Sequence, residues 1–182
     1  MTYGLPVAAG LMYRDSVEID ELKHPMEVRY LRLMPGTGGA GRHRGAPAME
    51  LAYGPMKSSM EVLWPCDGTV YAPRGVRGGH DGHKCRHWKV NANGQAEELP
   101  SVAVVTLNKG EMVKGNQAGG GGYGNPLERD PQRVLHDVLE RYETRERAEA
   151  VYCVLLVEDE HGQMTVDAEG TRRLRAGQTV RQ

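Results

Sequence analysis

Residues 80–87 carry the side chains best suited to chemistry, because they combine histidine and cysteine at short spacing. His83, Cys85 and His87 alternate along the chain, so an extended backbone would turn all three to one face. His80 lies just upstream, and the more distant Cys66 could add a thiolate. Imidazole nitrogen and thiolate sulfur are the ligands that zinc prefers in proteins. A zinc site is therefore one candidate function of this segment.

Two features of the same segment argue against a metal. Lys84 and Arg86 would place positive charge beside a dication, and the Cys-x-x-Cys spacing of common zinc sites is missing. We therefore expect a surface loop with no bound metal at this position. The alternative is a metal site formed by His80, His83, Cys85 and His87.

The second stretch of interest is residues 118–131, Ala-Gly-Gly-Gly-Gly-Tyr-Gly-Asn-Pro-Leu-Glu-Arg-Asp-Pro. Glycine has no Cβ, so this backbone can approach another surface closely. Asp130 followed by Pro131 predicts a helix start with the aspartate as N-cap. A glycine loop that leads into a helix could cradle an anion, but no Gly-Lys-Ser/Thr follows. We favour the simpler interpretation, which is a tight crossing where only glycine fits.

Residues 35–45 form a second glycine-rich stretch, and they carry Arg42, His43 and Arg44. One interpretation is a basic finger that contacts a partner or a ligand anion. The other, which we favour, is a solvated loop between two strands.

The elements that must position these stretches are short strands followed by helices. Alternating apolar residues between glycine and proline turns predict strands at 26–33, 48–53, 60–64, 88–94 and 101–107, with the second and third paired as a hairpin or meander and the last one buried. Helical spacing predicts helices at 131–142 and 144–150 and from Asp167 to Gly177, with a strand at 151–157. Residues 17–22 fit either a short strand or a helical turn, and residues 1–16 an extended arm.

These patterns predict an α+β fold that is mainly antiparallel β with glycine-rich loops, followed by a small C-terminal helical and β-hairpin segment. We expect one domain over residues 1–182. Its β-rich part spans 1–129 and includes the N-terminal arm, and a helix–hairpin–helix tail spans 130–182.

Composition narrows the function classes. Lys and Arg number 23 against 24 Asp and Glu, a net charge of −1, which argues against nucleic-acid binding. The N-terminus lacks the basic and apolar regions of a signal peptide, and no apolar run is long enough to span a bilayer. Three widely spaced cysteines argue against a disulfide scaffold and for a reducing compartment, so we expect a cytoplasmic protein. Gly-x-Ser-x-Gly, Walker A and His-Glu-x-x-His motifs are all missing.

Both glycine-rich stretches resemble signatures of the hydantoinase B family, the B component of ATP-dependent hydantoinases and oxoprolinases. Residues 118–131 are similar to the family's Pro-Gly-Gly-Gly-Gly-Tyr/Trp-Gly-Asp-Pro and the Glu-Arg-Asp-Pro that follows, with Ala118 and Asn125 as departures. Residues 35–45, Pro-Gly-Thr-Gly-Gly-Ala-Gly-Arg-His-Arg-Gly, are similar to the family's Pro-Gly-Ser-Gly-Gly-Ala-Gly-Arg-Tyr-Arg-Gly. The resemblance covers nearly the whole chain but only the C-terminal third of a usual B protein.

The resemblance implies a role inside an ATP-dependent complex. In that family an A component binds ATP and activates a carbonyl or enolate oxygen, and the B component opens the ring of hydantoins or 5-oxoproline. Catalytic and metal residues of B proteins are expected in their N-terminal two thirds. We therefore expect a small subunit, inactive alone, whose partners are a larger hydantoinase-A-like subunit and a truncated hydantoinase-B-like subunit. ATP and a divalent metal are expected in those partners, with no cofactor bound by this chain.

Two alternatives stay open. The first is a subunit of an acetone or acetophenone carboxylase, whose related subunits join bicarbonate-derived carbon to a ketone. The second is a free-standing binding module with a His and Cys metal site.

Within the family interpretation, the glycine stretch is an interface or a loop close to the substrate, with Tyr123 as its anchor. Gly121→Val is then expected to impair assembly while leaving the isolated fold largely intact. The resemblance also allows the arginines of 35–45 to act as buried anchors. The expected site residues are Gly119, Gly120, Gly121, Gly122, Tyr123, Gly124, Arg42 and Arg44.

Overall fold

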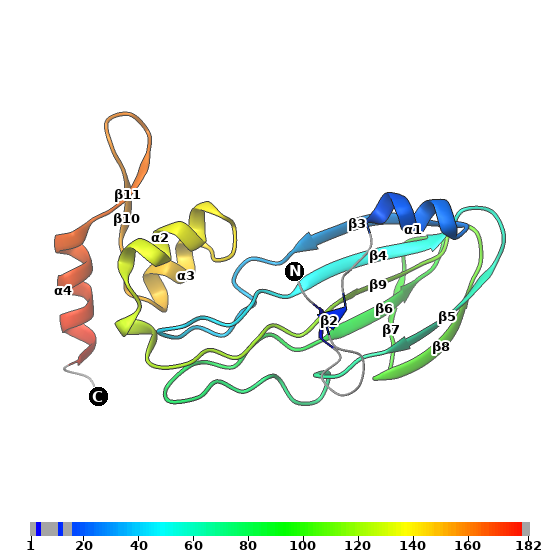
Figure 1. Ribbon diagram of the computed structural model, residues 1–182, viewed down its shortest axis with the longest axis horizontal. Helices are drawn as coiled ribbons and strands as arrows, with labels where there is room; N and C mark the ends of the chain where they lie inside the picture. The colour runs from blue at the N-terminus through cyan, green and yellow to red at the C-terminus, as the bar shows by residue number, and fades with distance from the viewer. Residues whose placement is uncertain (1–2, 5–10, 13–15, 180–182) are drawn as a thin grey trace.

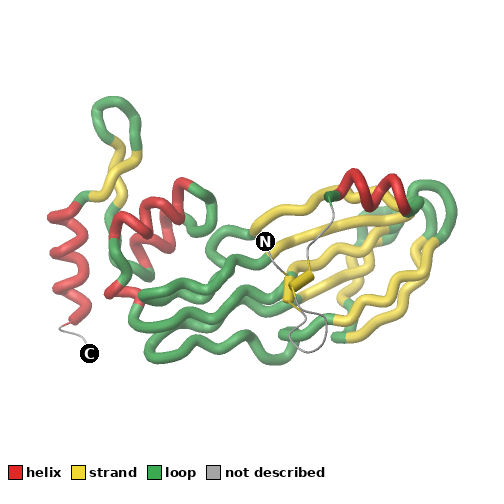
Figure 2. Tube along the Cα trace, in the orientation of Figure 1, coloured by secondary structure: helices red, strands yellow, loops and turns green. Residues whose placement is uncertain are grey.

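A computed structural model describes residues 3–4, 11–12 and 16–179 of the chain. The main strands lie at one end of an elongated molecule and the C-terminal helices at the other (Figure 1). Extended segments without regular secondary structure run side by side between the two ends (Figure 2). Of the expected N-terminal arm, the structure describes one short ladder between β1 (Tyr3–Gly4) and β2 (Leu11–Met12), and the remainder up to residue 15 lies outside the described residues.

Five antiparallel strands form the main sheet, in the order β3–β4–β9–β6–β7. Their bounds are Met26–Leu33 for β3, Met49–Pro55 for β4, Met112–Asn116 for β9, Arg86–Val90 for β6 and Ala96–Glu98 for β7. The strands predicted at 26–33 and 48–53 are thereby confirmed. Residues 17–22, for which strand and helical turn were both open, belong to α1 (Val17–Lys23), which Ser16 caps.

A second sheet of two strands, β5 (Met60–Pro65) and β8 (Val102–Leu107), packs against the main one. The predicted hairpin between 48–53 and 60–64 is therefore wrong, because β4 pairs with β3 and β9 while β5 pairs with β8. Apolar side chains of both sheets fill the space between them, with Val62, Leu107 and Val113 fully enclosed. Burying these side chains is the main force that holds the two sheets together.

Strand β8 buries only one of its two faces, which corrects the prediction of a buried strand. Ala103 and Leu107 are buried, whereas Val102 and Val104 are 63% and 61% exposed. Leu63 lies directly across from Val104 on β5 and is 64% exposed. We call Leu63, Val102 and Val104 the outer strip, since they form an apolar row on the outside of the second sheet.

The helical end contains three α-helices and a hairpin. These are α2 (Pro131–Leu139), α3 (Arg145–Ala150), β10 (Leu156–Glu158), β11 (Met164–Val166) and α4 (Ala168–Thr179), preceded by the short 3-10 helix η1 (Pro126–Glu128). The side chains of Asp130, Thr144 and Asp167 cap the three α-helices by accepting N–H bonds, and the first and last of these caps confirm the prediction. None of the helices that the described residues form is long and apolar enough to cross a membrane.

Val134, Ala148, Tyr152, Val154 and Leu156 form the core of this end. The strand predicted at 151–157 is wrong, because strand pairing begins only at Leu156. Cys153 has a φ of +51°, and a left-handed residue interrupts an extended strand.

Three excursions leave the sheets and run together toward the helices: residues 34–48, 66–85 and 117–125. Their backbones are joined by hydrogen bonds. The N–H of Gly39 donates to the carbonyl of Gly120 at 2.8 Å, and the N–H of Gly119 donates to the carbonyl of His83 at 2.9 Å. All three excursions bond to one another, and the excursion 117–125 is the central member because its successive glycines lie against different segments of the other two. We call the three excursions together the glycine bundle.

The neighbours of the central excursion repeat every three residues. A Cβ on Gly119 would collide with the carbonyl oxygen of Thr37, and a Cβ on Gly122 would collide with that of Ala40. The two positions between them face other parts of the bundle. Three residues per turn is also the period of polyproline II and collagen chains, where glycine alone fits at a crowded axis. The tight-crossing interpretation of the glycine stretch is confirmed.

Cys66 and Cys85 form a disulfide where the excursion 66–85 leaves β5 and returns to β6. The sequence argued against a disulfide scaffold, but the structure pairs these two cysteines. Their separation of 19 residues concealed the fact that the chain comes back to its starting point. Cys153 is free and buried, and burial raises the pKa of its thiol.

Candidate functional site

The end of the glycine bundle nearest the helices carries aromatic and basic side chains that we call the tip patch: Arg42, His43, Arg77 and Tyr123. The backbone of Tyr123 is held by bridges to His43 on one side and Val76 on the other. Its side chain is nevertheless 42% exposed. The bundle thus presents a tyrosine ring to the surface from a fixed backbone.

Basic groups surround this ring. The guanidinium carbon of Arg77 lies 5.6 Å from the centre of the Tyr123 ring, and the His43 ring lies 6.1 Å from it. Arg77 has a φ of +52°, which is uncommon for a residue with a side chain and aims the arginine over the tyrosine. Arg42 is exposed and lies 4.0 Å from Glu128. Tyrosine and arginine are the residue types that most often dominate protein interfaces, so this surface is suited to a partner.

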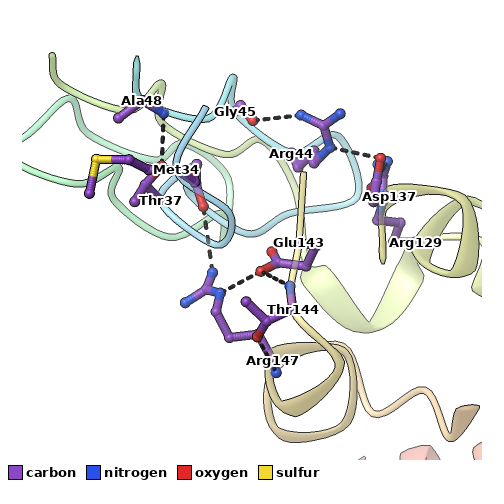
Figure 3. A network of polar contacts seen from close by, with 11 residues as sticks. Met34, Thr37, Arg44, Gly45, Ala48, Arg129, Asp137, Glu143, Thr144 and Arg147 are labelled. Carbon is purple, nitrogen blue, oxygen red and sulfur yellow. Dashed lines mark hydrogen bonds and ion pairs between the residues drawn. The ribbon is translucent and has the colours of Figure 1, made fainter. Parts of the chain in front are cut away.

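Arg44 lies close to Arg42 in sequence but points into the protein (Figure 3). Its Nε lies 2.9 Å from Oδ1 of Asp137, an ion-pair distance, and its guanidinium lies over the Tyr142 ring at 4.8 Å. The two arginines of the 35–45 stretch therefore differ: Arg42 belongs to the tip patch, and Arg44 is an internal anchor.

Asp137 holds two arginines with one buried carboxylate. Besides Arg44, its Oδ2 accepts hydrogen bonds from Nη2 and Nε of Arg129 at 2.6 and 3.1 Å. Arg129 donates further to the backbone carbonyl of Arg42 at 3.0 Å, which fastens the tip patch to α2. Asp137 does not stand out in the sequence, because helical spacing places it on the same polar side as the exposed Glu140.

A second set of contacts between the glycine bundle and the helices lies beside those of Asp137 (Figure 3). Arg147 of α3 donates from Nε to the buried Glu143 at 2.7 Å, and its Nη2 reaches the carbonyl of Gly38 at 3.5 Å. The N–H of Gly36 donates to the carbonyl of Tyr142 at 3.0 Å. The excursion 34–48 is thus attached to the helices through its backbone as well as through charged side chains.

The backbone of the glycine stretch is committed to contacts within the chain. The N–H groups of Gly119, Gly120, Gly122, Tyr123 and Gly124 all donate to carbonyl oxygens of the neighbouring excursions. An anion cradle needs such groups free to face the ligand. The described residues therefore do not fit a nucleotide phosphate at this position, and the anion-cradle interpretation is not supported.

The structure divides the His and Cys cluster. Cys85 and His87 are buried, while His80 and His83 are exposed, so the four predicted ligands do not come together. Residues 86–87 belong to β6 rather than to a surface loop. Instead, Cys66 joins Cys85 and His87, and their candidate ligand atoms all lie within 4.8 Å of one another.

Known proteins match this chain over most of its length. A family model described as Hydantoinase B/oxoprolinase matches residues 4–126, which contain both main sheets and the glycine bundle. The B component of a putative D-/L-hydantoinase from Pseudomonas sp. (strain NS671) is 32% identical over 169 residues, which cover 87% of this chain and 26% of that protein.

Solved structures extend the match. The crystal structure of the ATP-dependent caprolactamase from Pseudomonas jessenii has a TM-score of 0.71 and 27% identity, over 91% of this chain and 28% of that one. A nucleotide-free acetone carboxylase shares the fold, with a TM-score of 0.70 and 22% identity over 91% of this chain and 26% of that one. The chain thus spans about a quarter of the length of the relatives it matches.

Proposed function

This chain belongs to the hydantoinase B/oxoprolinase family, and we propose that it completes the B component of an ATP-dependent complex that opens cyclic amides. One observation carries the proposal. The match takes in nearly all of this chain but only about a quarter of relatives that include a hydantoinase component and a caprolactamase. The partners we propose are a larger hydantoinase-A-like subunit and a truncated hydantoinase-B-like subunit, in the cytoplasm.

We assign the catalytic chemistry of such a complex to the partner subunits. The N–H groups of Gly119, Gly120, Gly122, Tyr123 and Gly124 are bonded within the chain, which supports placing the nucleotide outside it. In this proposal, ATP and a divalent metal are bound by the partner subunits. This chain contributes the tip patch, which we propose lies against the catalytic partner close to the substrate, with Tyr123 as the anchor and Arg42 and Arg77 beside it.

The outer strip supports docking onto a larger B-like subunit. Leu63 and Val104 form an exposed cross-strand pair, and Val102 extends it along β8. Contiguous apolar side chains on a surface mark a site of protein contact more often than scattered ones do. We propose that the truncated B-like subunit covers this strip.

The test is co-purification followed by assay. The tagged chain is expressed with candidate A-like and B-like subunits, and the purified complex is assayed for ATP hydrolysis with hydantoins and lactams. A ketone with bicarbonate is the second arm, because the fold is shared with acetone carboxylase. We expect ATP turnover that depends on the cyclic amide and on the complete complex. Turnover of a cyclic amide by this chain alone, or turnover of the ketone only, would contradict the proposal.

Docking through the outer strip is tested separately. Leu63→Glu places a charge in the proposed interface and is expected to reduce capture of the B-like subunit. Val157→Glu, at an exposed valine of β10 far from the strip, is the matched control and should leave capture unchanged. Equal capture by both variants would remove the outer strip from the interface.

A further inference from the structure

Cys66, Cys85 and His87 form a cluster that the proposed function does not use. It lies where the excursion 66–85 starts at the end of β5 and finishes at the beginning of β6. The two sulfur atoms are joined as a disulfide, and a ring nitrogen of His87 lies within 4.8 Å of both. The cluster brings two thiol groups and one imidazole to one point, although Cys66 is distant in sequence.

The hydrogen bond of His87 fixes which ring nitrogen is free. Nε2 lies 2.7 Å from the carbonyl oxygen of Pro100. A carbonyl oxygen only accepts, so Nε2 carries the proton and Nδ1 of the neutral ring keeps its lone pair. The residue is 1% exposed, and Nδ1 has no hydrogen-bond partner among the described residues. A buried acceptor without a partner is unfavourable, so this nitrogen is available for a ligand.

The ring is also held in orientation. His87 stacks on Trp64 with ring centres 5.8 Å apart, and Trp64 stacks on Tyr53 at 5.8 Å. A histidine that donates one N–H to a backbone carbonyl and offers its other nitrogen is the usual arrangement of a metal-binding histidine. The environment of His87 therefore fits that of a metal-binding histidine.

The guanidinium group of Arg86 does not face the cluster. Its side chain forms two hydrogen bonds with Glu98, at 2.9 and 2.7 Å, and lies over the Trp88 ring. It is exposed, whereas the adjacent His87 is buried, as alternation along a strand requires. Lys84 is exposed as well. The positive charges of Lys84 and Arg86 argued against a metal in the sequence. In the structure they lie at the surface and not beside the cluster.

We propose that Cys66, Cys85 and His87 bind one thiophilic divalent cation, Zn²⁺, when the disulfide is reduced. A thiol reductant supplies two electrons and two protons to the sulfur–sulfur bond and gives two thiols. Binding of Zn²⁺ by both thiolates releases these two protons, and the neutral Nδ1 of His87 adds the third ligand. Water from the side of the half-buried Cys66 takes the fourth position.

In either state the cluster closes the base of the excursion 66–85, which supplies Arg77 to the tip patch. The disulfide does so under oxidising conditions and the metal under reducing ones. This ligand set replaces the one considered from the sequence: it keeps Cys85 and His87, adds Cys66 and leaves out His80 and His83, which are exposed.

The test measures how much zinc the full chain binds. The protein is reduced without oxygen, incubated with Zn²⁺, desalted and analysed for metal by mass spectrometry. We expect about one zinc per chain, as for a single Cys and His site. Cys66→Ser and His87→Gln should each lower this value at least fivefold, while His83→Gln, the exposed neighbour, should retain it. The oxidised protein should bind no zinc.

A spectroscopic measurement keeps the test decisive if a variant does not fold. Co²⁺ added to the reduced natural chain should produce the intense thiolate-to-cobalt absorption, which Zn²⁺ then displaces. Circular dichroism identifies variants that have lost the fold. Reduced natural protein without zinc or thiolate–cobalt absorption would overturn the proposal. So would a folded His83→Gln that loses as much zinc as a folded His87→Gln.

Discussion

The Nε of Arg44 lies 2.9 Å from Oδ1 of Asp137, and this contact joins the glycine bundle to helix α2. Arg129 approaches the other oxygen of the same carboxylate at 2.6 Å. The side chain of Asp137 is only 5% exposed, so water screens these charges poorly. One carboxylate is therefore the shared counterion of two arginines at the place where the tip patch is fastened.

Asp137→Asn should destabilise the protein strongly. The amide has a similar shape but no charge, which leaves Arg44 and Arg129 without a counterion in a buried position. Breaking a buried ion pair in this way costs about 3–5 kcal/mol. Urea unfolding followed by circular dichroism measures the loss. Glu169→Gln removes an exposed partner of Arg173 and serves as the control, for which we expect an unchanged midpoint. A midpoint for Asp137→Asn equal to that of the control would contradict the anchoring role.

Gly121→Ala should destabilise the isolated chain. The sequence alone predicts that even Gly121→Val spares the fold, but the structure reverses this expectation, because a Cβ here would collide with the carbonyl oxygen of Arg74. Gly177→Ala is the matched control: it lies in α4 with no atom within 4 Å of the added carbon. That change should be neutral or stabilise by about 0.5–1 kcal/mol, since alanine favours helix. Thermal unfolding of both variants provides the comparison, and equal melting temperatures would be inconsistent with the crowded bundle.

Tyr123→Ala should weaken binding to the catalytic partner with little effect on the fold. The ring is partly exposed and its position is set by backbone bridges, which the substitution leaves in place. Loss of an interface anchor costs about 2 kcal/mol or more, which is about 30-fold in affinity. Tyr71→Ala removes an 85% exposed tyrosine outside the tip patch and is the control. Affinity and melting temperature are measured on both, and an unchanged affinity for Tyr123→Ala would exclude the anchor.

Tyr152→Phe should maintain or raise stability at pH 7. The Tyr152 hydroxyl is buried and has no hydrogen-bond partner among the described residues, so its removal leaves no other group unpaired. We expect a gain between zero and about 1 kcal/mol. Urea unfolding at pH 7 measures it. A loss of about 2 kcal/mol or more would mean that the hydroxyl does have a partner.

The stability difference between Tyr152→Phe and the natural chain should depend on pH. Burial, with Glu143 as a smaller cause, raises the pKa of Tyr152 well above its usual value. In the unfolded chain the phenol ionises near pH 10, so the stability that its neutral form provides is complete below that pH and is lost as pH rises. Between pH 7 and about pH 11, Tyr152→Phe should gain about 1.4 kcal/mol relative to the natural chain. Tyr71→Phe, at an exposed site, should show no such gain.

Much of the fold could be predicted from local pattern. Alternation marked the strand Met26–Leu33, and Asp130 before Pro131 marked the start of α2. Pairing was not predictable in the same way. β5 reads as the natural partner of β4 because the two are close in sequence, yet the inner apolar residues of β5 and β8 are buried together against the main sheet. Which strands pair is decided by tertiary packing, and a local window of sequence does not contain it.

The candidate site was predictable in part. The glycine stretch and Tyr123 stand out by composition, whereas Asp137 and Arg77 look like ordinary exposed charges. Their roles depend on partners distant in the chain, Arg44 for the first and Tyr123 for the second. The meeting of Cys66 with His87 was hidden for the same reason, because it depends on the return of an excursion without periodic pattern.

The repeat of neighbours along the central excursion sets a rule for insertions and deletions. Removing one residue from 119–124 would shift every following position to a different neighbour. Tyr123 would then face a carbonyl oxygen that a glycine faces in the natural chain. Removing or adding three residues would return each position to its own side of the bundle. Change in length within this stretch should therefore be tolerated only in multiples of three, as in chains with a three-residue turn. The glycine bundle therefore fixes the register of this stretch: a shift by one complete turn preserves its contacts, and a shift by one or two residues does not.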